Sequence, residues 1–311
     1  MTLKINIISQ ERSGLAADTK ILTDLFESQG WHVHISHYRT LSRFTPLRFK
    51  KFDLNIFIQR ANSGWFGLAR KNVFIPNPEW LKKKYEKNIE KFDAVFCKTH
   101  CAVEALGNMN RNTIFVGFTS INKHDSNFEK QGDRWLHLAG KSELKGTDVI
   151  IDTWLKNPHF PHLTIIYRNR TYQNINRPNL TYISERIDNS RLIRLMNECA
   201  VHLCPSITEG FGHTLCEALS CGALIISTDA PPMNELITPD RGILIKPVAQ
   251  KKLRFADTYF IDQEGLEKAV KKTINLTNKK ELMLNGFNFF SENDNAFKEI
   301  IIKEIKELFS D

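Results

Sequence analysis

One stretch, residues 204–235, constrains what this chain can fold into more than any other. Its sequence is CPSITEGFGHTLCEALSCGALIISTDAPPMNE, and it overlaps the end of an apolar segment, Val201–Cys204. The pattern predicts a buried strand, a loop with a Gly-Phe-Gly turn, a helix from about Gly212 to Ser220 and a second buried strand, Ala223–Ser227. Glycines in the turn let the backbone pass close to a ligand. The free N–H groups at the start of the helix favour an anion such as phosphate.

Two acidic residues flank this turn. Glu209 precedes the predicted helix, and Glu217 lies on its second turn. A carboxylate accepts hydrogen bonds from hydroxyl groups, which is how proteins hold sugars and riboses. A phosphate site between two hydroxyl-binding acids is what a nucleotide sugar requires.

The spacing of these acids around Gly-Phe-Gly resembles the donor site of retaining glycosyltransferases of the GT-B fold, family-4 type. The resemblance implies that Glu209 is the catalytic residue facing the transferred sugar and that Glu217 binds the ribose. It also implies a set of contacts to the donor sugar and diphosphate, made by Gly210, Phe211, Gly212, His213, Thr214 and Leu215.

A second segment, Gly140-Lys-Ser-Glu-Leu-Lys-Gly146, contains the letters GKS. It is not a P-loop, because Trp135 stands where the first glycine of that motif belongs. The segment resembles the diphosphate clamp of the same family, in which two cations offset the charge of the pyrophosphate. Lys141 occupies the usual Arg position without the bidentate fork of Arg, and Lys145 comes one residue earlier than is common.

Further expectations follow for the beginning of the chain. The family resemblance puts Gly14, in a loop after the first strand, close to the donor phosphates or the acceptor, whereas a simple tight turn explains this glycine equally well. The His that many family members carry at a strand end of the first domain is not apparent. The comparable positions hold Gln59-Arg60 and Asn77-Pro-Glu79, and His100 is expected at a helix start.

No metal or other cofactor is expected beyond the UDP- or GDP-linked sugar that serves as co-substrate. The sequence contains no Asp-x-Asp motif, in agreement with the metal independence that the fold implies, and none of its six cysteines forms a CxxC pair. Small buried thiols in a reducing compartment explain the cysteines better than zinc or disulfides do.

The αβ alternation predicts an α/β protein with two Rossmann-like, doubly wound domains facing across a cleft. Residues 1–125 form the acceptor-side domain and 130–290 the nucleotide-sugar-binding domain, with Phe118–Gly132 as an irregular linker. Apolar residues at helical spacing predict a final helix, 294–311, which the GT-B resemblance returns to the first domain; they are Phe297, Ile301, Ile305 and Leu308.

The net charge of +8 lies entirely in the first 130 residues, which hold 20 Lys and Arg against 12 Asp and Glu. It is densest around Trp80-Leu-Lys-Lys-Lys-Tyr-Glu-Lys, where a basic helix is expected to open at Glu79. A solvated helix face is the plain interpretation. The alternative is a surface for an anionic partner, such as a phosphorylated acceptor or a lipid headgroup at a membrane.

No apolar run approaches the ~18–20 residues of a membrane span, and Met1–Ser9 is too short for a signal peptide. The expected location is therefore the cytoplasm, with peripheral membrane contact as the alternative. The expected partners are a nucleotide sugar and an acceptor glycan, lipid-linked sugar or protein. Nucleic acid is not expected, because the basic half lacks interleaved aromatic residues.

Two other functions stay open at this point. Gly210-Phe-Gly212 with Asp229 partly imitates a dinucleotide fingerprint of an NAD-dependent enzyme, although Leu215 replaces the third glycine. A glycosyltransferase-like accessory subunit that binds a sugar nucleotide without catalysis would explain the missing first-domain His.

Overall fold

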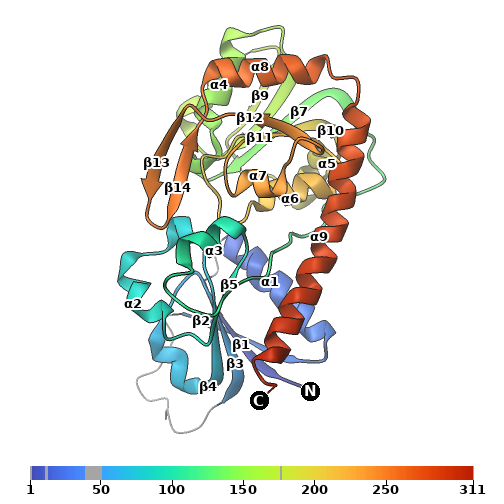
Figure 1. Cartoon of the computed structure of the whole chain (residues 1–311). Coiled ribbons are helices and arrows are strands. Elements are labelled where there is room, and N and C mark those ends of the chain that lie inside the picture. The colour runs from blue at the N-terminus through green and yellow to red at the C-terminus, as the bar shows by residue number, and fades with distance from the viewer. Residues whose placement is uncertain (1, 11–12, 39–50, 176, 311) are drawn as a thin grey trace. The chain divides into compact units, whose positions relative to one another are not determined.

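The computed structural model describes residues 2–10, 13–38, 51–175 and 177–310. The chain divides into two compact units (Figure 1). Unit 1 is assigned Met1–Ile121, Leu253–Ala256 and Asn293–Asp311, and unit 2 is assigned Asn122–Lys252 and Asp257–Glu292. Each unit contains a six-stranded sheet whose neighbouring strands run parallel. The predicted α/β class with two doubly wound units is therefore confirmed.

The sheet of unit 1 has the strand order β2-β1-β3-β4-β5-β6. The order reverses direction after β2, so the chain winds outward both ways from β1 and β3. The elements of this unit are β1 Lys4–Ser9, α1 Ser13–Ser28, β2 His32–His37, β3 Phe52–Ile58, β4 Ala69–Ile75, α2 Glu86–Ile89, β5 Ala94–Cys97, α3 His100–Leu106 and β6 Thr113–Phe115.

The sheet of unit 2 has the order β12-β11-β10-β7-β8-β9. Its elements are β7 Gln131–Gly140, α4 Thr147–Lys156, β8 His162–Tyr167, β9 Leu180–Ile183, α5 Asn189–Glu198, β10 Cys199–Cys204, α6 His213–Ser220, β11 Leu224–Thr228, α7 Met233–Leu236, β12 Gly242–Ile245 and α8 Gln263–Ile274. The strands β13 Ala249–Leu253 and β14 Ala256–Phe260 form a separate two-stranded sheet. The 29-residue helix α9, Lys279–Glu307, belongs to unit 2 at its start and to unit 1 at its end.

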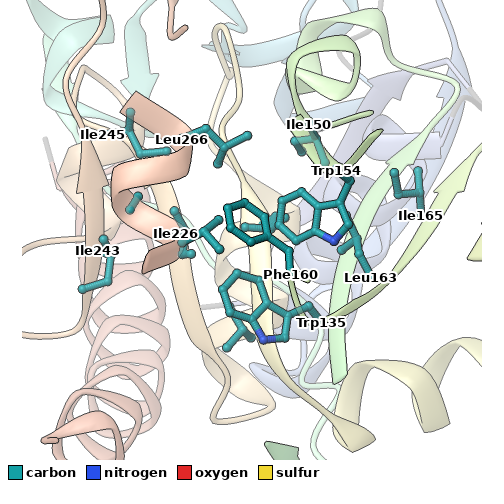
Figure 2. Close-up of a cluster of buried hydrophobic side chains, with 14 of the residues drawn as sticks. Trp135, Ile150, Trp154, Phe160, Leu163, Ile165, Ile226, Ile243, Ile245 and Leu266 are labelled. Carbon is teal, nitrogen blue, oxygen red and sulfur yellow. The ribbon is translucent and has the colours of Figure 1, made fainter. Parts of the chain in front are cut away.

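Aromatic residues fill the core on one face of the unit 2 sheet (Figure 2). The rings of Trp135 on β7 and Trp154 on α4 lie 5.9 Å apart, and Trp154 meets Phe160 edge-on at 5.4 Å. The indole N–H of Trp154 donates to the Pro161 carbonyl at 2.9 Å, so no buried donor is left unpaired there. Helices α4 and α8 cover this face, and each contributes a side chain to the cluster: Trp154 from α4 and Leu266 from α8.

A row of buried polar side chains crosses the sheet of unit 1. Asn6, Asn55 and Asn72 are direct neighbours in the strand register, and all three are buried. Asn6 donates to Asn55 and Asn55 donates to Asn72, each at 3.0 Å, while the Ser36 hydroxyl donates to Asn6 at 2.7 Å. Each amide thus finds a partner in the next strand, which is what makes polar groups tolerable in a core.

Four expectations about local structure need correction. The basic segment after Glu79 is not one helix: it forms 3₁₀ turns at Pro78–Trp80 and Lys83–Tyr85 and the short α2. In a continuous helix Lys83 and Lys84 would lie four and three residues from Lys87 on one face, and like charges at that spacing disfavour the helix. Phe118 is not linker, since it is 1% exposed and packs on Phe297. The strands β13 and β14 were not expected, and the final helix expected at 294–311 begins earlier, as α9 at Lys279.

The periodicity of the last helix was predicted correctly. Phe297, Ile301 and Ile305 are at most 1% exposed, while Leu308 is partly buried. Lysines and acids between them face solvent and pair along the helix, as Lys298 and Asp294 do at 2.5 Å.

A buried ion pair joins three elements of unit 1. The Lys98 ammonium, just after β5, donates to Asp18 Oδ2 of α1 at 2.6 Å and to Asn77 Oδ1, just after β4, at 3.1 Å. Both charged side chains are 2% exposed, and the ammonium lies 4.4 Å from the centre of the Phe118 ring. A charge buried to this degree is tolerated only while its partner is present.

We expect Lys98→Met to lower the free energy of unfolding of unit 1 by about 3–5 kcal/mol, because the buried Asp18 carboxylate would lose the ammonium that lies 2.6 Å from it. The double variant Lys98→Met/Asp18→Leu should recover most of that loss. The control is Lys20→Met, which breaks an exposed pair with Asp24 on the same helix and should cost under about 1 kcal/mol. Denaturant unfolding measures all three, and a Lys98→Met loss no larger than the control's would contradict the argument.

Gly146 allows the two segments that follow β7 and β10 to touch. It caps the start of α4 with a φ of +67°, and a Cβ at this position would collide with the carbonyl oxygen of Pro205. Gly140, at the end of β7, has a similar φ of +59°, but a Cβ there would meet no atom within 4 Å. The two glycines share the left-handed backbone and differ only in the space available.

We expect Gly140→Ala to cost about 1 kcal/mol of unfolding free energy, which is the price of a left-handed non-glycine residue. Gly146→Ala should cost at least about 2 kcal/mol more, because the Pro205 segment must also move. Thermal or denaturant unfolding of both variants measures the difference. Equal losses would show that the approach to Pro205 is not a constraint.

Candidate active site

Two strand-end segments of unit 2 lie side by side. Strands β7 and β10 are parallel neighbours, so their carboxyl ends meet at one edge of the sheet, where α/β proteins bind ligands. The segment after β7 contains Lys145, and the segment after β10 contains Glu209. The Ile207 N–H donates to the Leu144 carbonyl at 2.8 Å and joins the two backbones.

Three of the predicted site residues are in direct contact. The Lys145 ammonium donates to Glu209 Oε1 at 2.5 Å and to the Thr214 hydroxyl at 2.9 Å. The side chains of Lys145 and Glu209 are 13% and 12% exposed, so the pair is largely shielded from water. The Ser206 hydroxyl donates to the same Glu209 oxygen at 2.6 Å. A cation, a carboxylate and two hydroxyls thus share one small volume.

The start of helix α6 adds backbone donors to this cluster. Gly212 caps the helix with a φ of +110°, and a Cβ there would press on the side chains of Leu215 and Leu236. The first N–H groups to bond back to the Gly212 carbonyl are those of Leu215 and Cys216. The N–H groups of His213 and Thr214 therefore precede the helical ladder, and the first turn contains no acid. This is the arrangement that attracts an anion.

Glu217 lies one turn further along α6. Burial raises the pKa of its carboxyl, and the nearby His213, Lys123 and Lys145 oppose that rise. Among the residues that the structure describes, none donates a hydrogen bond to the Glu217 side chain. A buried carboxyl without a protein donor is suited to accepting hydrogen bonds from a bound hydroxyl compound.

A buried histidine, His137, connects the elements on which the cluster stands. His137, on β7, places Nδ1 at 2.7 Å from the Leu203 carbonyl and Nε2 at 2.8 Å from the Thr147 hydroxyl. Burial lowers the pKa of His137 to about 4, and Lys145 acts in the same direction. The ring is therefore uncharged at neutral pH and serves to join β7, β10 and the start of α4.

The other predicted residues have different surroundings. Lys141 is exposed, and no side-chain contact of it appears in the described structure. Phe211 is 3% exposed, with its ring edge-on to His213 at 5.5 Å between centres. Gly14 lies in unit 1, in the first turn of α1, while Glu11 and Arg12 of its expected loop are outside the described residues. The roles assigned to the site residues stay predictions.

Sequence reasoning missed Ser206, His137 and Thr147. Ser206 lies only three residues before Glu209, but its local sequence does not indicate that its hydroxyl reaches the carboxylate. His137 and Thr147 are distant in sequence from Leu203, and only the fold brings them together.

At the strand ends of unit 1, His100 begins helix α3 as expected, and its ring stacks on Phe115 at 3.8 Å. The guanidinium of Arg60, after β3, lies 4.5 Å from the Tyr38 ring centre and bonds to Gln10. Within the described ranges, no group of three or more potential ligands could hold a metal ion. In the same ranges, no helix combines the length and the apolar character required to cross a bilayer.

Comparison with known proteins agrees with this geometry. Residues 168–277 match the model of the family "Glycosyl transferases group 1". A search of curated proteins gave no match. Among solved structures, sucrose-phosphate synthase from Thermosynechococcus elongatus superposes with a TM-score of 0.74 at 15% identity, covering 99% of both chains.

Two other solved structures are similar over a comparable share of both chains. A glycosyltransferase from Rickettsia africae has a TM-score of 0.70 at 14% identity, covering 100% of this chain and 99% of its own. HepE from Anabaena, in complex with UDP and glucose, has a TM-score of 0.71 at 15% identity, covering 98% and 100%. The region 168–277 is thus similar to the glycosyl transferases group 1 family, and the superpositions over nearly the whole chain show that the protein has the GT-B fold.

Proposed function

We propose that the protein moves a sugar from a nucleoside-diphosphate sugar, UDP- or GDP-linked, to an acceptor hydroxyl, with retention and without a metal ion. The observation that carries this proposal is the contact of Lys145 with Glu209 and Thr214 at the start of α6. The HepE structures with UDP and glucose and with UDP-glucose support it by showing such ligands on a similar fold.

The diphosphate would lie against the start of α6. Lys145 and the N–H groups of His213 and Thr214 supply positive charge and donors there, and exposed Lys141 supplies a second cation from the end of β7. These groups stabilise the nucleoside diphosphate as it departs, which is the step at which negative charge develops. In this scheme the two lysines and the helix start do what a divalent ion does in other transferases.

The acids would hold the hydroxyl groups on either side of the diphosphate. Glu217 accepts from the ribose, since its buried carboxyl otherwise lacks a donor among the described residues. Glu209 orients the sugar and stabilises the positive charge that develops at its anomeric carbon. The acceptor hydroxyl attacks from the face that the diphosphate leaves, so the configuration is retained.

The dinucleotide alternative has less support. Eight residues, 205–212, separate the end of β10 from the first residue of α6. A dinucleotide fingerprint needs a tight turn between strand and helix. An accessory subunit that binds the donor without transferring sugar stays the second candidate, because the segments that follow β3 and β4, Gln59-Arg60 and Asn77-Pro-Glu79, contain no histidine. Donor hydrolysis separates the two candidates.

We expect one of the UDP-, GDP-, ADP- and dTDP-sugars to raise the melting temperature, equally with and without EDTA. Lys145→Ala and Glu217→Ala should each weaken that binding by at least about tenfold, since each removes a charged hydrogen-bond partner. The wild type should also hydrolyse the donor slowly, and Glu209→Gln should not. Glu143→Gln, an exposed acid in the same segment as Lys145, is the control.

Binding without hydrolysis would favour the accessory subunit. If none of the four sugar nucleotides raises the melting temperature, both candidates are excluded. A shift lost in EDTA would refute metal independence.

The acceptor side has one marked surface feature. Between Trp80 and Lys91 the side chains of Lys82, Lys83, Lys84, Lys87 and Lys91 are exposed, and Trp80 itself is 47% exposed. Lysines of α8 and α9 pair with acids one turn away, but within the described part of the chain none of these five forms an ion pair. We propose that this segment meets an anionic membrane surface, from which a lipid-linked acceptor would be drawn.

We expect the protein to sediment with phosphatidylglycerol vesicles and not with phosphatidylcholine vesicles. Reversing three charges, in Lys82→Glu/Lys83→Glu/Lys84→Glu, should weaken this binding by at least about tenfold, because each lysine near an anionic surface contributes about 1 kcal/mol. The matched control, Lys268→Glu/Lys271→Glu/Lys272→Glu on α8, changes the net charge equally. Equal losses in both variants would leave only non-specific attraction, and binding of RNA in preference to vesicles would replace the membrane with nucleic acid.

A further inference from the structure

The Lys145–Glu209 pair opposes the diphosphate that Lys145 is proposed to bind. Among the described residues, the two donors to the Glu209 carboxylate, Lys145 and Ser206, both bond to Oε1. Oε2 accepts from none of the described residues. The charge of Lys145 is thus already balanced by a carboxylate 2.5 Å away, while the second oxygen of that carboxylate, Oε2, can accept a hydrogen bond from a ligand.

We propose that Glu209 makes the site discriminate between the intact nucleotide sugar and the nucleoside diphosphate product. This inference rests on the proposed function and assigns a further task to the same residue. A diphosphate must share the Lys145 ammonium with Glu209, and the negative carboxylate also repels it. The diphosphate of either ligand meets this obstacle, so a second interaction must favour one of them.

The sugar supplies that second interaction. Its hydroxyl groups donate to Glu209 and replace the donor that the carboxylate loses when Lys145 turns to the diphosphate. Glu209 is only 12% exposed, so water compensates it poorly, and a lost donor there is costly. The intact nucleotide sugar therefore separates the pair at little net cost, whereas the nucleoside diphosphate alone leaves Glu209 short of a partner.

The same competition favours release of the product. When the sugar passes to the acceptor, Glu209 loses its hydroxyl donors and attracts Lys145 again. Thr214 holds the ammonium at the start of α6, so the change of partner requires only a short movement of Nζ. The carboxylate that helps to bind the donor then weakens the hold on the diphosphate.

Titration calorimetry of the full chain tests this with UDP, GDP, ADP and dTDP and with the corresponding sugar nucleotides. Glu209→Gln removes the charge and keeps the shape, so it should bind the matching nucleoside diphosphate about tenfold more tightly than the wild type. It should bind the nucleotide sugar no more tightly, so the preference for the intact donor falls. Glu143→Gln, with the same change in net charge, should leave both affinities unchanged.

Two further variants test the same competition: one should weaken diphosphate binding, and the other should abolish the gain that Glu209→Gln gives. Ser206→Ala removes the other donor to Oε1 and makes Glu209 depend more on Lys145, so the diphosphate should bind several-fold more weakly. In a Lys145→Ala background, Glu209→Gln should give no gain, because the cation for which both anions compete is gone. Thermal unfolding of each variant checks that it is folded.

The outcomes separate the inference from the function on which it rests. If the wild type binds a nucleoside diphosphate and Glu209→Gln binds it equally or more weakly, the inference is wrong and the donor site stands. If neither protein binds any of the four diphosphates, the proposed function itself fails. A gain that survives in the Lys145→Ala background would also overturn the inference, since the competition would then not involve Lys145.

Discussion

The site depends on a backbone approach that only glycine permits. Gly146 brings the segment after β7 against the Pro205 carbonyl of the segment after β10. One hydrogen bond, from Ile207 to Leu144, holds the two segments in register. The contacts of Lys145 with Glu209 and with the Thr214 hydroxyl follow from that approach, because the lysine and its partners come from separate segments. The chemistry of the site is thus set by where two strands of one sheet end.

Each unit contains a buried lysine–acid pair, and the two pairs differ in their surroundings. The side chains of Lys98 and Asp18 are 2% exposed, and Asn77 and the Phe118 ring lie against the ammonium of Lys98. A ligand in solution therefore has no access to this pair. Lys145 and Glu209 keep 13% and 12% of their side-chain surface and lie beside a helix start. The first pair suits a fixed junction between elements. The second pair keeps some exposure, which the proposed competition with a ligand requires.

Much of the fold follows from local sequence patterns. The helix expected from about Gly212 to Ser220 and the strand expected at Ala223–Ser227 lie within one residue of α6 and β11, because a glycine turn and a short apolar run mark them. The spacing of Glu209, Gly212 and Glu217 gave the candidate site, and the roles assigned to these residues stay predictions. Periodicity misled where charge and proline dominate, as in the segment after Glu79.

Contacts between residues distant in sequence were beyond such patterns. The pairing of Lys98 with Asp18 spans 80 positions, and that of Lys145 with Glu209 spans 64. Neither partner's local sequence indicates the other, because each contact exists only once the parallel strands have assembled. The contact of Ser206 with Glu209 was not predictable either. The two residues are close in sequence, but the direction of the Ser206 hydroxyl depends on the turn that follows β10.

The asparagine row of unit 1 has a consequence for the accuracy of folding. Asn6, Asn55 and Asn72 find one another only in the native alignment of β1, β3 and β4. Sliding β3 by one residue would set Leu54 or Ile56 beside Asn6 and strand several amides in an apolar interior, at a few kcal/mol for each. Apolar residues alone would tolerate such slippage more readily, since isoleucine, leucine and valine pack interchangeably. The polar row therefore favours the native register of β1, β3 and β4 over shifted registers.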